Sequence, residues 1–396
     1  MASTGTRRAT VILRTVSLAV AILVASATPA AAGAREQAKR IHDRLVGVPP
    51  LPDAHDSMEA QILAGDAIGA AYYAMDHPLF YSSALKNFAT PWTNVERTVF
   101  ADLNDYTATV IGMIRDDVAF DQVLSADLVY VGAPGFASTG YSQADNEHYR
   151  ELEALGVDLG DPSQLVAQSQ SGQAGSPLGP GDAAGVMTTR AAGEAFFSAG
   201  TNRRMWRFTS LNFLCRDLED MQDITRPVDR IRQDVSRSPG GDSSVFHNTC
   251  TGCHSGMDPM AGAFAYYEWD MEAERLLYTP GQVQPKHLIN AETFPYGYVT
   301  ADDRWDNHWR AGINAALGWA DGPGGGFGAK SLGEEITGSR AFSVCQVEKV
   351  FAQVCFRPVS SPADRAAVDQ IADVFEGQNY SLKRVFAETA VYCMGD

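Results

Sequence analysis

Basic residues are in short supply in this chain of 396 residues, where 31 Lys and Arg side chains stand against 48 Asp and Glu side chains. The formal net charge is therefore −17 at pH 7. Nucleic acids and anionic membranes attract basic proteins, so this deficit argues against both as partners. The simplest interpretation of the acidic charge is solubility, and the alternative is steering toward a positively charged protein partner.

Recognisable hydrolase and nucleotide-binding patterns are also missing. No P-loop, Ser-His-Asp or paired-carboxylate pattern has a supporting sequence context, so neither function has positive support. No internal repeat is present. The length is sufficient for two or three domains with separate cores.

Long apolar runs are absent. The longest stretch near the N-terminus, residues 16–27, is shorter than the ~20 residues that span a bilayer. It follows the basic residues Arg7, Arg8 and Arg14 and precedes the small-residue sequence 30–32. This order predicts a cleaved signal peptide over residues 1–32, export in the unfolded state to the periplasm or beyond, and no integral membrane segment after cleavage.

Cysteine and histidine are scarce, with six and eight copies, yet five neighbouring residues concentrate them. Residues 250–254 read Cys-Thr-Gly-Cys-His, which is the C-x-x-C-H attachment pattern of a c-type haem. Cys250 and Cys253 would form thioethers with the haem vinyl groups, and His254 would ligate the iron. The pattern occurs once, which excludes a multihaem electron wire.

Three other interpretations of this motif were weighed. A zinc site using His247 lacks a second pair of ligands, because no other C-x-x-C occurs. A thioredoxin-like redox motif normally opens a helix after a strand, which the flanking sequence does not suggest. A Cys250–Cys253 disulfide would leave His254 unexplained.

The other four cysteines form an even set that favours disulfides in an oxidising compartment. Residues 341–355 are predicted to form one helix, which would hold Cys345 and Cys355 about 15 Å apart, beyond the ~7 Å limit for bonding. If this helix packs up-down-up with helices over 363–375 and 382–393, the C-terminal ends of the first and third helices meet. The predicted pairs are therefore Cys355–Cys393 and Cys215–Cys345.

Apolar periodicity and capping residues predict a mostly α fold. Its parts are a signal peptide (1–32), a helical N-terminal domain (33–167), a linker (168–185), a cytochrome c-like haem-binding domain (186–320) and a C-terminal three-helix module (321–396). Further helices are expected over 35–46, 57–75, 203–221 and 227–235 and within 94–115, and one strand over 128–131. Asp258 and Pro259 resemble a helix start, with Met260, Phe264, Tyr267 and Met271 on one face, and the block 302–319 is expected to place Trp305, His308, Trp309 and Ile313 on a helix.

Three arginines lie in the predicted helix 227–235 or just before it. Arg226, Arg230 and Arg232 would suit haem propionates, because a guanidinium matches a carboxylate in a bidentate fork. The favoured alternative is a solvated face paired locally with Asp229 and Asp234.

A second axial ligand would separate electron transfer from catalysis, since Met or His closes the iron and an open position permits peroxide or oxygen chemistry. Met257 is too close to His254 in sequence to reach the opposite haem face. The sequence leaves five candidates, or none: Met205, Met221, Met271, His287 and His308.

The flanks of the motif resemble those of planctomycete-type c-type cytochrome proteins. The resemblance rests on residues 250–259, 263–264 and 268–270, on 41–50, 120–131, 185–188 and 212–215, and on 331–357 with 380–382. The chain lacks that family's arginine-rich helical expansions and inserts residues 276–307 before the C-terminal module. The resemblance implies covalent haem at Cys250, Cys253 and His254, an exported location and electron transfer.

Together these features predict an exported monohaem c-type cytochrome that exchanges single electrons with a redox partner protein. The alternative is a haem enzyme with an open sixth position, such as a peroxidase-like oxidoreductase. A third, weaker hypothesis is a scaffold protein with a structural haem.

Overall fold

The computed structural model describes Met1 and residues 32–395, except 199 and 290. The predicted signal peptide lies almost wholly outside the described residues. Helices make up 53% of the structure and strands 7%, which confirms a mostly α fold. The α-helices are α1 (Ala34–Val46), α2 (Pro52–Leu63), α3 (Ala67–Met75), α4 (Lys86–Ala89), α5 (Asp105–Arg115), α6 (Glu147–Ala154), α7 (Arg190–Ala192), α8 (Arg203–Phe213), α9 (Ser243–Val245), α10 (Thr251–Ala261), α11 (Gly328–Thr337), α12 (Arg340–Cys355), α13 (Pro362–Gly377) and α14 (Leu382–Cys393).

The strands form three antiparallel pairs. They are β1 (Val129–Gly132) with β2 (Leu165–Gln168), β3 (Tyr267–Asp270) with β4 (Arg275–Tyr278), and β5 (Arg304–Asp306) with β6 (Gly325–Phe327). The strand predicted over 128–131 is confirmed by β1, whose Val129, Tyr130 and Val131 are all buried. No helix in the described part of the chain is both long and apolar enough to span a bilayer.

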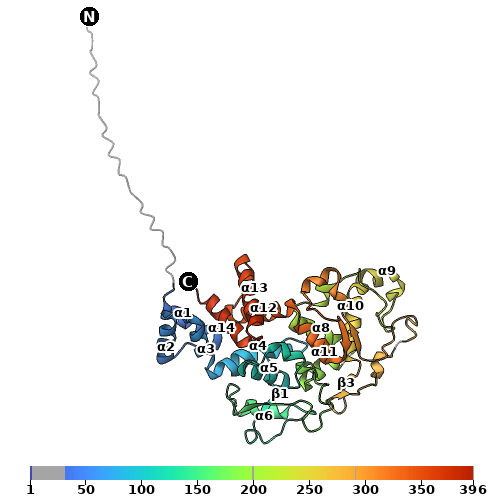
Figure 1. Ribbon diagram of the computed structural model, residues 1–396, viewed down its shortest axis with the longest axis horizontal. Helices are drawn as coiled ribbons and strands as arrows, with labels where there is room; N and C mark the ends of the chain where they lie inside the picture. The colour runs from blue at the N-terminus through green and yellow to red at the C-terminus, as the bar shows by residue number, and fades with distance from the viewer. Residues whose placement is uncertain (2–31, 199, 290, 396) are drawn as a thin grey trace.

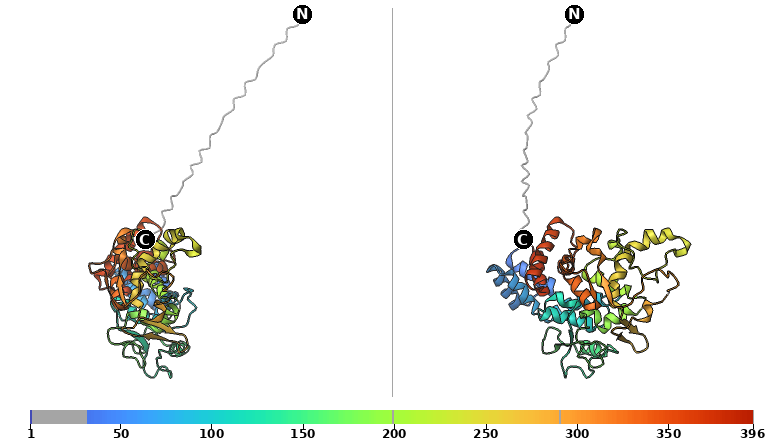
Figure 2. Two further views of the ribbon diagram at one scale, coloured as in Figure 1. Left: turned by 90° about the vertical axis from the view of Figure 1, so that its right-hand side faces the viewer. Right: turned by 45° about the vertical axis from the view of Figure 1, so that its right-hand side comes forward.

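The first and last helices pack together at one end of the molecule. Figure 1 shows α1, α2 and α14 at this end, with α9 and α10 toward the opposite end, and the right-hand view of Figure 2 shows the same separation. The side chains of Gln37 and Arg40 on α1 donate hydrogen bonds to the carbonyls of Gly395 and Met394. The two ends of the described chain therefore meet, although more than 350 residues separate them.

Two predicted helices are shorter than expected. The single helix expected over 57–75 is divided into α2 and α3, because Gly65 takes a left-handed conformation and Asp66 caps α3 by accepting from the Gly69 amide (2.7 Å). Within 94–115 only α5 is an α-helix. Its N-cap is Asn104, which accepts from the backbone N–H of Thr107 (2.9 Å). Local capping groups, which satisfy the first free amides, set both boundaries.

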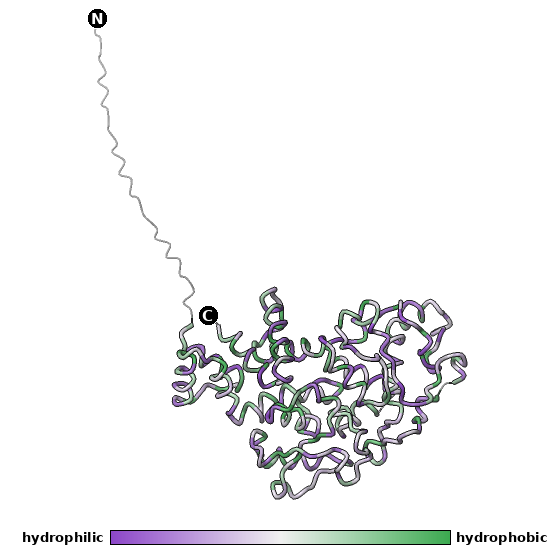
Figure 3. Tube along the Cα trace, viewed as in Figure 1, coloured by the Kyte–Doolittle hydropathy of each residue, from purple (hydrophilic) through white to green (hydrophobic). Residues whose placement is uncertain are grey.

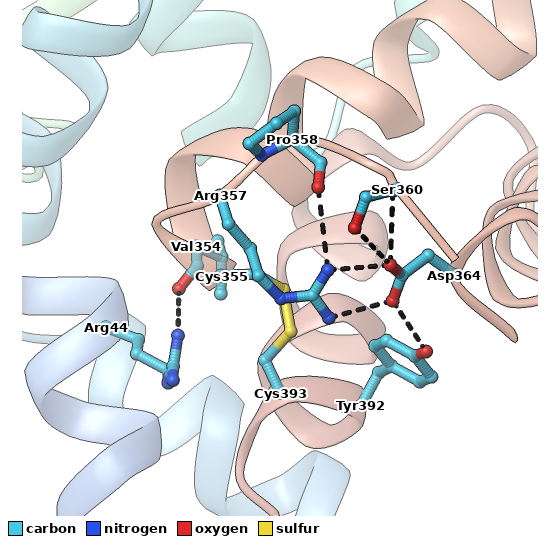
Figure 4. The surroundings of a disulfide bond; sticks show 9 residues. All are labelled: Arg44, Val354, Cys355, Arg357, Pro358, Ser360, Asp364, Tyr392 and Cys393. Atoms are coloured by element: carbon cyan, nitrogen blue, oxygen red, sulfur yellow. Dashed lines mark hydrogen bonds and ion pairs between the residues drawn. A yellow bond between two sulfur atoms is a disulfide. The ribbon is translucent and has the colours of Figure 1, made fainter.

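The C-terminal module has the predicted helices and disulfides. Cys355 and Cys393, at the C-terminal ends of α12 and α14, are bonded to each other, with Cα atoms 5.6 Å apart. Figure 4 shows this disulfide beside Arg357, whose guanidinium forms a bidentate pair with Asp364 (2.7 and 2.8 Å). Cys215 and Cys345 form the second disulfide and join the segment after α8 to α12.

Predicted helices between residues 203 and 319 are largely replaced by shorter elements. The helix expected over 203–221 ends at Phe213, and a 3₁₀ turn follows at Leu218–Met221. Residues 227–235 form turns rather than a helix, and 302–319 contain β5 and two 3₁₀ segments. Tyr267 lies on β3 and Met271 follows it, so they do not continue the helical face of Met260.

One main hydrophobic core extends through the described chain, with buried side chains from α1 to α14. Hydrophobic and hydrophilic residues are interspersed along the trace (Figure 3). A smaller cluster of Ile231, Val235 and Phe246 lies next to Cys250. The division into domains stays a prediction.

Candidate functional site

The C-x-x-C-H motif begins in a π-helical turn, Phe246–Cys250, and continues into α10. Residues three apart in helical backbone lie on the same side, so this conformation brings Cys250 and Cys253 together. His254 follows in the next position of α10. The two thiols and the imidazole that would hold a haem therefore lie within little more than one helical turn.

Cys250 and Cys253 are unpaired, half-buried thiols, whereas the four other cysteines form disulfides. Cys250 packs against the small apolar cluster, and the Cys253 Sγ atom lies 3.5 Å from the Leu218 carbonyl oxygen. Burial, followed by the neighbouring Cys250, raises the pKa of Cys253 to about 11.

His254 has one ring nitrogen occupied and one available. Nδ1 lies 3.0 Å from the Asp258 Oδ1 atom, one helical turn further along α10. An ionised carboxylate only accepts hydrogen bonds, which places a proton on Nδ1, so that in the neutral imidazole the lone pair is on Nε2. The His254 side chain is 20% exposed, and Nε2 has no hydrogen-bond partner among the described residues. This is the tautomer that metal ligation through Nε2 requires.

Asp258 belongs to a buried ionic network with Arg203, Arg232 and Asp234, here called the Asp258 network. The Asp258 side chain is 0% exposed and forms a bidentate pair with Arg203 (2.7 and 3.0 Å). Arg203 also forms a bidentate pair with Asp234 (both 2.8 Å), and the Arg232 amide donates to Asp258 (3.1 Å). Burial alone would raise the pKa of Asp258, but the two arginines outweigh burial and hold it well below its ordinary value.

A proline inside α10 positions another histidine against the motif. Pro259 is not at a helix start, as predicted from sequence, but within the helix. Without an N–H it leaves the Ser255 carbonyl, four residues earlier, without its helical donor. Nδ1 of His308 lies 2.9 Å from that carbonyl oxygen. His308 therefore completes the hydrogen bonding of α10 beside His254.

The three arginines have protein partners. Arg226 pairs with Asp223 (3.1 Å), and Arg230 with Asp306. Arg232 is fully buried rather than on a solvated face, and its Nε atom lies 3.8 Å from Asp234. Only this last pairing involves an acidic partner proposed from the sequence. The solvated face was predicted from a helix over residues 227–235. That helix does not form, so the arginines do not share an exposed helical face.

The five candidate second ligands are in different environments. Met205 and Met221 are buried, and their sulfur atoms accept from Thr209 and Ser210. Both ring nitrogens of His287 lie 3.2 Å from side-chain donors, on Asn202 and Arg232.

The other two candidates are less enclosed. His308 keeps Nε2 available, and Met271 is 70% exposed after β3. The structure assigns no second axial ligand.

Comparison of the chain with models of protein families, with curated proteins and with solved structures finds no match. In the described residues no group of three or more His, Cys, Asp or Glu side chains is arranged to hold a metal ion.

Two exposed apolar side chains lie near the motif. A haem edge needs apolar contacts, and Ile224 and Ile313 are 69% and 64% exposed. Ile224 lies against Gly252, and the Ile313 amide donates to Asp223 (3.3 Å), whose own amide donates to the Gly252 carbonyl (3.1 Å). Exposed apolar side chains thus lie near the segment that carries two free thiols and an available imidazole nitrogen, the donor set that a c-type haem would need.

Cys250, Cys253 and His254 stand out in the sequence, but Asp258 was missed as the partner of His254. The signal was present, because residues four apart face each other on a helix. It was hidden by Pro259, which made Asp258 resemble an N-cap. Arg203 and Arg232 carry no comparable signal, since they reach the site from distant segments.

Proposed function

We propose that the protein is an exported monohaem c-type cytochrome that transfers single electrons. The observation that carries this proposal is the chemical sorting of the cysteines: four are bonded in pairs, and the two in the C-x-x-C-H motif are free. Cys250 and Cys253 would hold the haem covalently, and Nε2 of His254 would ligate its iron. Bound haem supplies the one-electron ferric/ferrous couple.

Export is supported by the disulfides. Disulfides form and persist in oxidising compartments, which are also where haem is joined to a C-x-x-C-H motif. Together with the leader predicted over residues 1–32, this supports a periplasmic or secreted location. The redox partner that follows from the net charge of −17 is a protein with a positively charged docking face.

The decisive experiment is expression with a cytochrome c maturation system, followed by intact-mass measurement and a pyridine haemochrome spectrum. We expect one covalently bound haem per chain, bound through two thioethers. A mature protein with the mass of the bare polypeptide and no Soret absorption would refute the proposal.

A haem enzyme with an open sixth position is the second candidate. It is favoured by one observation, that three of the five candidate second ligands, Met205, Met221 and His287, are already engaged in hydrogen bonds. Carbon monoxide separates the two functions. Slow or absent binding to the reduced protein is expected for a six-coordinate electron carrier, whereas rapid stoichiometric binding would support the enzyme.

A further inference from the structure

The Asp258 carboxylate contacts the ring nitrogen of His254 that would face away from a bound haem iron. We propose that Asp258 is a positioning residue that acts through His254 to lower the reduction potential of the haem, an inference that rests on the proposed function. The juxtaposition that carries it is the 3.0 Å contact between His254 Nδ1 and the fully buried Asp258 carboxylate.

The contact with Asp258 changes the electron density of the His254 imidazole. An N–H that donates to a carboxylate leaves more electron density on the ring than one that donates to water, so Nε2 becomes a stronger ligand. A stronger donor stabilises the ferric state more than the ferrous state, because the ferric ion carries the larger charge. The reduction potential therefore falls.

The Asp258 carboxylate is ionised and held in place by its neighbours. Arg203 holds both of its oxygens, and the backbone amide of Arg232 donates to Oδ2. These contacts leave one geometry in which Oδ1 accepts from both Arg203 and His254. A histidine held in this way has a defined ring orientation as well as a defined tautomer.

The Asp258 network also contains Asp234, a carboxylate that can serve as a matched control for Asp258. Asp234 is also buried, with a side chain 6% exposed, and also forms a bidentate pair with Arg203. It makes no contact with His254 among the described residues. Asp258 and Asp234 are thus two carboxylates of one buried network, of which only one is bonded to the iron ligand.

The experiment compares Asp258→Asn with Asp234→Asn in haem-loaded protein, using spectroelectrochemical titration. Loss of a contact to a ligating histidine changes metal-site properties by about tenfold or more. We expect Asp258→Asn to shift the electron-exchange equilibrium toward the reduced protein by about tenfold, which is 59 mV for a one-electron couple. Asp234→Asn is expected to shift it several-fold less.

A second measurement reports on the iron–histidine bond itself. Its stretching frequency, read by resonance Raman spectroscopy on a five-coordinate ferrous form, should fall in Asp258→Asn and stay unchanged in Asp234→Asn. Asp258→Glu keeps the negative charge, so its reduction potential should lie between those of Asp258→Asn and the wild-type protein. If Asp258→Asn does not fold, the frequency in Asp258→Glu compared with Asp234→Asn provides the test, and only the former should change.

Two outcomes would overturn the inference. One is an equal potential shift in both asparagine variants, which would reduce Asp258 to one charge among several. The other is an unchanged iron–histidine frequency in Asp258→Asn. Failure of the proposed function is distinguishable from both, because there the wild-type protein itself would carry no covalent haem.

Discussion

The C-terminal helical end of the molecule and the region around the C-x-x-C-H motif are stabilised in different ways. Helices α12–α14 contribute regular apolar faces to the main core, and a disulfide joins two of them. Around the motif the elements are short, and a buried ionic network connects distant segments. A periodic apolar pattern specifies the first region locally, whereas the second depends on polar contacts formed only in the folded chain.

The largest effect expected from this contrast concerns the two classes of cysteine. The double variant Cys250→Ala/Cys253→Ala should lose covalent haem completely, because both thioether positions are gone. The matched variant Cys355→Ala/Cys393→Ala should keep it. Intact mass and the pyridine haemochrome spectrum measure both. Covalent haem on the first variant would show that the thiols have another role.

The next largest effect is on stability. Cys215–Cys345 closes 130 residues and Cys355–Cys393 closes 38, so chain entropy gives losses of about 5 and about 4 kcal/mol when each is removed. The Cys215–Cys345 disulfide also joins the segment after α8, on the side of the C-x-x-C-H motif, to α12. Urea unfolding of the two Cys→Ala pairs measures the difference. A smaller loss for the pair at 215 and 345 would mean that native packing already holds the regions together.

The same contrast explains how much of the fold the sequence predicted. Residues 341–355, 363–375 and 382–393 have an amphipathic period and clear caps, and α12, α13 and α14 match them within a few residues. The Cys355–Cys393 pair follows from the packing of these helices, and Cys215–Cys345 is the pair that then remains. The arginine-rich segment 227–235 has comparable helix formers, yet it forms turns because Arg232 is drawn into the buried network.

The candidate residues of the site stand out in the sequence, whereas their environment does not. Cys250, Cys253 and His254 follow from spacing along one segment. Arg203 approaches from α8 and His308 from a 3₁₀ turn after β5, and nothing in the sequence pairs either with residues 254–258. Long-range polar contacts have no periodic signature, so only the folded chain identifies them.

A smaller effect is expected from the same substitution in each region. A Cβ atom added at Gly256 in α10 would lie 2.1 Å from the ring of buried Trp309, whereas one at Gly377 in α13 meets nothing within 4 Å. Gly256→Ala should therefore cost about 1–3 kcal/mol by overpacking. Gly377→Ala should gain about 0.5–1 kcal/mol, because alanine is the better helix former. Urea midpoints measure both, and a stabilising Gly256→Ala would contradict the packing of α10 on Trp309.

The smallest effect is a pH dependence specific to the motif side. Burial, followed by the charge of Arg232, lowers the pKa of His287 from 6.5 to about 2. Lys286 and Arg203 lower it further, and Asp258 opposes them. The unfolded chain therefore binds a proton below pH 6.5 that the folded chain refuses, and the stability contributed by neutral His287 is lost as the pH falls below 6.5.

The expected slope is about 1.4 kcal/mol per pH unit between pH 6 and pH 5. Glutamine keeps hydrogen-bonding groups but does not titrate, so His287→Gln should remove this slope even if it lowers stability at pH 7. Urea unfolding of both proteins at pH 7, 6 and 5 gives the difference. Equal slopes would mean that His287 is accessible to protons in the folded state. The polar network near the C-x-x-C-H motif would then exclude solvent less well than the packed helices α12–α14 do.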